Sequence, residues 1–124
     1  MKTERNEPEI RVLMMPRDTN AHGTIFGGII LSYIDQAGAV AAHRAGCRKV
    51  VTVAMDQIEF HEPVRVGDLV SFYAEVEKIG RTSITVVVRV HAQCEDLRKS
   101  VLVTEARVVY VNVGDDQRPQ SIEA

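Results

Sequence analysis

Cysteine is scarce in this sequence of 124 residues, and neither of the two cysteines lies in a metal-binding or redox motif. Cys47 and Cys94 are therefore expected to be small buried residues in a reducing compartment. An excess of charge of either sign is also missing, because 15 Lys and Arg residues face 17 Asp and Glu residues. The net charge of −2 gives no overall attraction to nucleic acid or to an anionic membrane, so neither is expected as a partner.

Several familiar signals are absent as well. The N-terminal stretch MKTERNEPEIR lacks the apolar core of a secretory signal, which makes a cytoplasmic protein the default expectation. There is no serine elbow, no phosphate-binding loop of the P-loop kind, no internal repeat and no low-complexity block. The histidines show no metal-ligand spacing, so no metal site is expected: His22, His43, His61 and His91.

One long apolar run dominates what is present. Residues 25–42 read IFGGIILSYIDQAGAVAA, and Asp35 carries the only charge among them. The run has about the minimum length for a membrane span, but a central acid and three glycines argue against that reading. A helix that is apolar on nearly every side has to be buried. An ionised carboxylate in its middle costs several kcal/mol unless something pairs with it or uses it.

The start of this helix carries a second chemical feature. Gly27 and Gly28 weaken its first turn but leave backbone N–H groups uncovered for a ligand, with Thr24 as a possible N-cap. The helix is expected to end near Gly46. Uncovered donors together with a buried acid indicate a catalytic site. Two structural alternatives stay open: the acid could be capped by a hydroxyl or a backbone group, and the glycines could serve close packing alone.

The rest of the chain predicts β-structure within a single α+β domain. An N-terminal tail is expected over residues 1–7, the domain over 8–113, and a polar C-terminal tail over 114–124. One sheet, an antiparallel meander curved around the helix, cannot cover every side of it, so a second subunit is expected. The predicted strands are Glu9–Met15, Lys49–Phe60, Asp68–Ile79, Thr82–Gln93 and Val101–Val113.

This layout resembles the hot-dog fold, and four stretches support a closer match: MPRDTNAHGTIFGGIILSYIDQAG, VVTVAMDQIEFHEPVRVGDLV, KIGRTSITV and TEARVVYV. They resemble the cytosolic acyl-CoA thioester hydrolases of the YciA and brown-fat-inducible type, over about residues 11–113. The resemblance implies hydrolysis of acyl-CoA to a free acid and coenzyme A, in fatty acid metabolism. It also implies dimers with active sites at the subunit interface, assembled into a hexamer as a trimer of dimers. No cofactor is implied, since coenzyme A is part of the substrate and product.

The same resemblance assigns the acid to Asp35, its polar partner to Asn20, and the backbone donor to Gly27 with Gly28 beside it. Asp35 would act either as general base on a water held by Asn20 or as a nucleophile forming a mixed anhydride. The helix N–H would stabilise the oxyanion. Gly27 and Asp35 lie roughly 12 Å apart along one straight helix, so Gly27 of one subunit is expected to meet Asp35 of its neighbour. By itself, Asn20 would more often be a turn residue.

Coenzyme A itself is expected to meet the turn Gly80, Arg81, Thr82 and Ser83, which resembles the family's turn for the pantetheine and nucleotide. Backbone N–H groups, hydroxyls and a guanidinium suit that task. An ordinary hairpin with a surface arginine is the alternative. Two other functions are less consistent with the sequence. A non-catalytic acyl-CoA-binding sensor is disfavoured because the candidate catalytic residues are present, and a hydratase needs a differently placed catalytic histidine.

Overall fold

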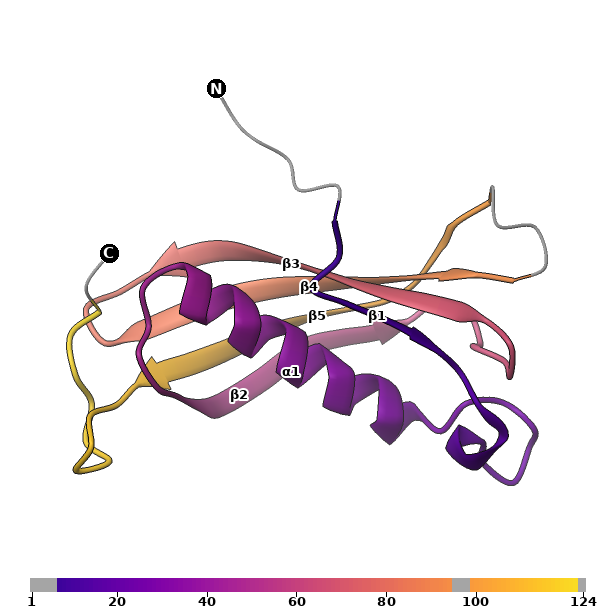
Figure 1. Cartoon of the computed structure of the whole chain (residues 1–124), viewed down its shortest axis with the longest axis horizontal. Coiled ribbons are helices and arrows are strands. Elements are labelled where there is room, and N and C mark those ends of the chain that lie inside the picture. Colours follow the sequence, from indigo (N-terminus) through magenta and orange to yellow (C-terminus); the bar gives the residue numbers. More distant parts are fainter. Residues whose placement is uncertain (1–6, 95–98, 123–124) are drawn as a thin grey trace.

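One long helix lies across one face of a five-stranded antiparallel sheet (Figure 1). The computed structural model describes residues 7–94 and 99–122, so the predicted N-terminal tail falls outside it except for Glu7. The α+β architecture predicted from the sequence is confirmed. The elements in chain order are β1 (Ile10–Leu13), the 3-10 turn η1 (Pro16–Asp18), α1 (Gly27–Arg44), β2 (Val50–Phe60), β3 (Leu69–Ile79), β4 (Ser83–Gln93) and β5 (Val101–Asn112).

The ends of α1 are set by backbone geometry. The prediction of Thr24 as N-cap is wrong, because Phe26 occupies that position without a side-chain cap. The hydroxyl of Thr24 instead accepts a hydrogen bond from the Asn20 amide at 3.0 Å. The predicted C-terminal end is confirmed: Ala45 caps the helix, and Gly46 follows with a φ of +114°, a conformation that glycine adopts without strain.

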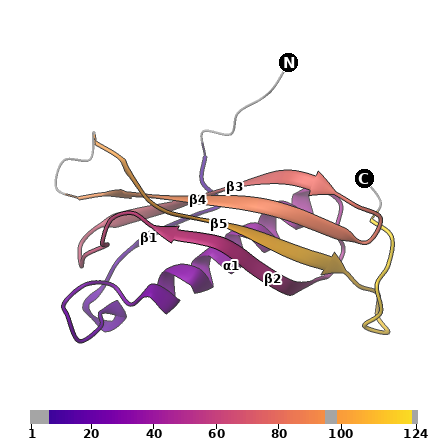
Figure 2. The ribbon, with the colours of Figure 1, turned by 180° about the vertical axis from the view of Figure 1, so that it is seen from behind.

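The strand order is β1-β3-β4-β5-β2, with every pairing antiparallel. Strands β3 to β5 form the expected meander, but β2 pairs with β5 and not with its chain neighbour β3. The link after β2 passes the start of α1, where the N–H of Ile25 donates to the carbonyl of Val64 at 2.8 Å. The chain therefore crosses from one edge of the sheet to the other between β2 and β3. Seen from behind, the sheet lies in front of the helix (Figure 2).

The core forms between the inner face of the sheet and one face of α1. Val70, Phe72 and Ala74 of β3 are buried, as are the alternate β4 residues from Ile84 to Ala92. The opposite face of α1 is open in the single chain, where Ser32, Gln36 and Val40 are exposed. This openness agrees with the expectation that one sheet cannot enclose the helix. The buried residues of α1 are Ile30, Ile34, Ala37, Gly38, Ala41 and Ala42.

Asn112, at the end of β5, joins the segment before β2 to the segment after β5. Its side-chain oxygen accepts hydrogen bonds from the backbone N–H groups of Arg48 and Lys49, at 2.9 and 3.3 Å. Its amide nitrogen donates to the carbonyls of Gln120 and Ser121, at 3.1 and 3.2 Å. All its hydrogen-bonding directions are thus used in a residue that is 2% exposed.

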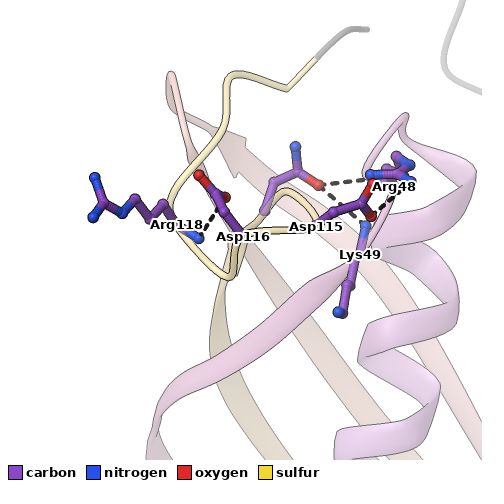
Figure 3. A network of polar contacts seen from close by, with 6 residues as sticks. Arg48, Lys49, Asp115, Asp116 and Arg118 are labelled. Carbon is purple, nitrogen blue, oxygen red and sulfur yellow. Dashed lines mark hydrogen bonds and ion pairs between the residues drawn. The ribbon is translucent and has the colours of Figure 1, made fainter.

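One ion pair and one turn hydrogen bond lie beside this junction on the surface. The guanidinium of Arg48 contacts the carboxylate of Asp115 at 2.9 Å, and the backbone N–H of Arg118 donates to the carboxylate of Asp116 at 3.0 Å (Figure 3). The segment after β5 also returns to the β3–β4 turn, where the N–H of Ile122 donates to the carbonyl of Arg81 at 2.8 Å. The predicted polar tail is therefore packed against the sheet as far as Ile122.

Two expectations drawn from composition have different outcomes. Cys47 is buried as predicted, and burial raises the pKa of its thiol. Cys94 is exposed, so its prediction as a buried residue is wrong; it is the residue just after β4, beyond the reach of the core. Among the described residues, no helix combines the length and the apolar character that a membrane span needs.

We expect Asn112→Ala to lower the free energy of unfolding by about 2–4 kcal/mol, because it leaves buried N–H and carbonyl groups unpaired. The measurement is urea denaturation followed by circular dichroism at one fixed protein concentration. Ser121→Ala, in the same segment, is the matched control and should change stability by less than about 0.5 kcal/mol. Equal effects of the two substitutions would show that the junction does not depend on the Asn112 side chain.

Candidate active site

Asp35 lies in the middle of α1, on the flank between the buried face and the open face. Its carboxylate oxygen Oδ1 accepts a hydrogen bond from the hydroxyl of Thr52 in β2, at 2.7 Å. The sequence predicted a buried acid. In the single chain Asp35 is only partly buried, with Thr52 of β2 against its carboxylate. An accessible carboxylate with one fixed hydroxyl donor can accept a proton or attack a carbonyl carbon.

A second hydroxyl reaches the backbone of the same residue. The phenol of Tyr110 in β5 donates a hydrogen bond to the carbonyl oxygen of Asp35 at 2.6 Å. Tyr110 is fully buried. Burial raises the pKa of the Tyr110 hydroxyl well above its ordinary value, and the negative charge of Asp35 raises it further. The phenol therefore keeps its proton and remains a donor at physiological pH.

Gly38 makes room for this phenol. A Cβ atom at position 38 would collide with the Tyr110 hydroxyl oxygen and would come within 3.0 Å of the ring carbons. Glycine inside a helix costs about 1 kcal/mol relative to alanine, so its presence there needs a cause. The close approach of Tyr110 supplies that cause.

Gly27 and Gly28 are the first two residues of α1, where helical geometry leaves N–H groups without a partner in the helix. Neither N–H group donates a hydrogen bond to a backbone acceptor outside the helix among the described residues. Gly27 borders a pocket of about 230 Å³, whose other lining residues include Ile30, Phe60 and Val64. Gly27, unlike Gly28, therefore lies beside a hollow whose walls are apolar apart from Thr24, His61 and Glu62.

The structure does not bring Gly27 and Asp35 of one chain together. They lie on one helix, eight residues apart, which corresponds to about 12 Å along its axis. One thioester carbonyl spans a much shorter distance than this. If both residues act on the same carbonyl, they must come from two different chains.

Asn20 organises the loop that leads into α1. Its side-chain oxygen accepts hydrogen bonds from the N–H groups of His22 and Thr24, at 2.8 and 3.2 Å. Its amide nitrogen donates one hydrogen to the Thr24 hydroxyl, at 3.0 Å. An amide carries two N–H groups, so Asn20 retains one further donor while it holds the turn. Asn20 can therefore stabilise the turn and still offer a hydrogen bond in catalysis.

Gly80 to Ser83 form the tight turn between β3 and β4. The N–H of Gly80 donates to the carbonyl of Ser83 at 2.7 Å, which closes the hairpin. The side chain of Arg81 is exposed, and Thr82 and Ser83 are partly buried. The turn thus presents one cation at the surface beside two hydroxyl groups, an arrangement that suits a phosphate-bearing ligand.

One group of side chains has the composition of a metal site. Ligand atoms of Glu59, His61 and Glu105 lie within 4.8 Å of one another. Glu59 and His61 are exposed, and Arg89 already pairs with Glu105 at 3.5 Å. We assign no metal to this cluster. His22 is exposed, and its described contact is the backbone hydrogen bond to Asn20.

Thr52, Tyr110 and Gly38 did not emerge from the sequence as site residues. Thr52 and Tyr110 are direct partners in the β2–β5 ladder, 58 positions apart in the chain, and a sequence without its strand register does not show that pairing. One signal was available for Gly38. A glycine in mid-helix predicts that some neighbouring group approaches the backbone closely.

Comparison with known proteins identifies the family and the fold. The family model described as the thioesterase superfamily matches residues 22–99. The acyl-CoA thioester hydrolase YciA of Salmonella typhimurium is 39% identical over 97% of this chain and 92% of its own length. A hexameric hotdog fold thioesterase of Campylobacter jejuni is 45% identical, with a TM-score of 0.89 over 95% of this chain and 91% of that one. The structure of a hexameric broad specificity acyl-coenzyme A thioesterase is 37% identical, with a TM-score of 0.90 over 96% and 88%.

The buried phenol leads to a prediction about alkaline pH. Unfolded Tyr ionises near pH 10, whereas folded Tyr110 keeps its proton at higher pH. Its contribution to stability is therefore fully present below about pH 10 and is lost as the pH rises further. We expect the urea midpoint of the wild-type protein to fall more steeply between about pH 10 and pH 12 than that of Tyr110→Phe. Other ionising groups are common to both proteins, so parallel curves would contradict the prediction.

Proposed function

The chain belongs to the thioesterase superfamily, and from this we propose that it hydrolyses acyl-CoA thioesters to a carboxylic acid and free coenzyme A. The observation that carries the proposal is the carboxylate of Asp35, which is accessible, hydrogen-bonded to Thr52, and set in an otherwise apolar helix. The relatives named acyl-CoA thioester hydrolase support the substrate class. We propose that it accepts a broad range of acyl chains, in line with the broad specificity of the similar thioesterase.

In the general-base route, Asp35 takes a proton from a water molecule whose oxygen attacks the thioester carbonyl carbon. The carbonyl oxygen becomes an oxyanion, which the N–H of Gly27, with that of Gly28 beside it, stabilises at the positive end of the α1 dipole. The carbon–sulfur bond then breaks, and the coenzyme A sulfur leaves with the proton that Asp35 returns. Asn20 orients the water through its remaining amide N–H.

In the nucleophilic route, a carboxylate oxygen of Asp35 attacks the carbonyl carbon directly, and the coenzyme A thiolate leaves. Water then hydrolyses the mixed anhydride and restores the carboxylate. The hydroxyl of Thr52 serves either route, because it fixes one carboxylate oxygen and leaves the other for reaction. Both routes consume only substrate and water, so we propose that no cofactor takes part.

We further propose that the working site lies between two copies of the chain. The outer edge of β2 faces no other strand among the described residues, and Val51, Val53 and Phe60 on β2 are exposed apolar residues. A second copy that covers this edge and the open face of α1 would place its Gly27 opposite Asp35. The hexamers formed by the similar thioesterases support a trimer of such dimers.

The coenzyme A portion is proposed to lie along the β3–β4 turn. Arg81 would meet a phosphate, while Gly80, Thr82 and Ser83 would meet the pantetheine arm and the nucleotide. The pocket beside Gly27 would take the first part of the acyl chain, since its walls include Ile30, Phe60 and Val64. The reaction therefore takes place between the two ends of the bound substrate.

Replacement of Asp35 tests the reaction itself. We expect Asp35→Asn to lower kcat for thiol release from acyl-CoA by about 10²–10⁴-fold, because it removes the base or nucleophile. Thiol release is measured with acetyl-CoA to palmitoyl-CoA, together with circular dichroism and the oligomeric state of each variant. Full activity in an assembled Asp35→Asn protein would refute the role of Asp35. Binding of acyl-CoA by the wild-type protein without thiol release would identify a sensor.

Mixed assemblies test the shared site. Asn20 lies in the loop next to Gly27. In each shared site, one chain should therefore supply Asn20 with Gly27, and the other chain should supply Asp35. We expect Asp35→Asn and Asn20→Ala chains to be nearly inactive alone and to recover about a quarter of wild-type activity when co-expressed in equal amounts. The reason is that half of the dimers are mixed, and each mixed dimer has one intact site. No recovery in verified mixed oligomers would place both residues of a site on one chain.

Replacement of Arg81 tests the coenzyme A turn. We expect Arg81→Ala to raise KM for acyl-CoA by about tenfold with little change in kcat, because it removes an ion pair with a phosphate. The matching substrate is the same acyl group on N-acetylcysteamine, which has no phosphate, and its kinetics should be unchanged. An equal effect on both substrates would show that Arg81 supports the turn and does not bind phosphate.

A further inference from the structure

Two neighbouring strands each direct one hydroxyl group at Asp35. Thr52 of β2 donates to the carboxylate at 2.7 Å, and Tyr110 of β5 donates to the backbone carbonyl at 2.6 Å. These two donors are direct cross-strand partners in the β2–β5 ladder. Asp35 is therefore held at two points, its side chain and its main chain, by a single pair of sheet residues.

The hydrogen bond from Tyr110 is not needed to satisfy the helix. In an α-helix, the carbonyl of residue 35 already accepts the N–H of Ala39. A phenylalanine ring would fill the same buried space without bringing a polar atom into the core, which normally carries a cost. The hydroxyl must therefore be explained by what it does to the position of this helical turn.

The helix itself is shaped to receive the phenol. Gly38 follows Asp35 by three residues, and a side chain there would overlap the Tyr110 hydroxyl. The contact thus depends on two features, a buried hydroxyl on β5 and a missing side chain on α1. Both fix the turn of α1 that carries Asp35 at one height above the sheet.

We propose that Tyr110 is a positioning residue for the reaction: its hydroxyl fixes the turn of α1 so that the Asp35 carboxylate meets Thr52 and the substrate carbonyl. This inference rests on the proposed thioesterase function. A displacement of the carboxylate by even 1 Å changes the alignment of the attacking atom with the carbonyl carbon. Tyr110 acts through Asp35 and touches neither substrate nor water.

The test compares Tyr110→Phe with the matched control Tyr73→Phe. Tyr73 lies on the other face of the sheet, edge-on to His91 with ring centres 5.5 Å apart. We expect Tyr110→Phe to lower kcat by between about tenfold and a hundredfold while KM changes less than about twofold. Tyr73→Phe should match the wild-type protein in both kcat and KM.

A Tyr110→Phe protein with wild-type kcat and KM overturns the proposal, whatever happens to its stability. If that variant does not assemble, Gly38→Ala decides by the same kinetic criteria, since it keeps the hydroxyl but fills its place. The thioesterase function and the role of Tyr110 can be refuted separately. An inactive wild-type protein overturns both the thioesterase function and the role of Tyr110, whereas an active enzyme that needs Asp35 but not the Tyr110 hydroxyl overturns only the latter.

Discussion

Burial of one face of α1 against the inner face of the sheet is the contact on which the other features depend. Ile30, Ile34 and Ala37 on α1 pack against strands whose inward residues are fully buried. The fit leaves the opposite face of a largely apolar helix exposed, with Phe26 and Val40 at its surface. Asp35 lies at the boundary between the two faces. A carboxylate at such a boundary can be held by the sheet and still be reached by a ligand.

Much of the fold could be predicted from the sequence, because its patterns are local. Alternation of apolar and polar residues gave the strands to within two residues at each end. Gly46 marked the end of α1, since its positive φ is a local backbone property. The pairing of β2 with β5 could not be predicted in this way. Alternation shows which face of a strand is buried but does not identify its neighbour, and the crossing link after β2 has no pattern of its own.

The residues of the candidate site also differ in whether the sequence alone identifies them. Asp35, Gly27 and Gly28 were identifiable because a charge and two glycines stand out in an apolar helix. Asn20 was identifiable through the motif around it, and the structure adds that it also holds its own loop. Thr52 and Tyr110 look like ordinary strand residues until the register of β2 against β5 brings their hydroxyl groups to Asp35. Site residues that depend on register are the ones that sequence reasoning misses.

The overlap between position 38 and the Tyr110 hydroxyl also constrains how this protein can evolve. Alanine at position 38 would favour the helix, but it becomes acceptable only after position 110 has lost its hydroxyl or shifted its ring. A change at position 110 meets no such steric overlap, although loss of the Tyr110 hydroxyl removes the contact that positions Asp35. Lineages that descend from this sequence should therefore change position 110 before position 38, which makes the history of the two sites directional.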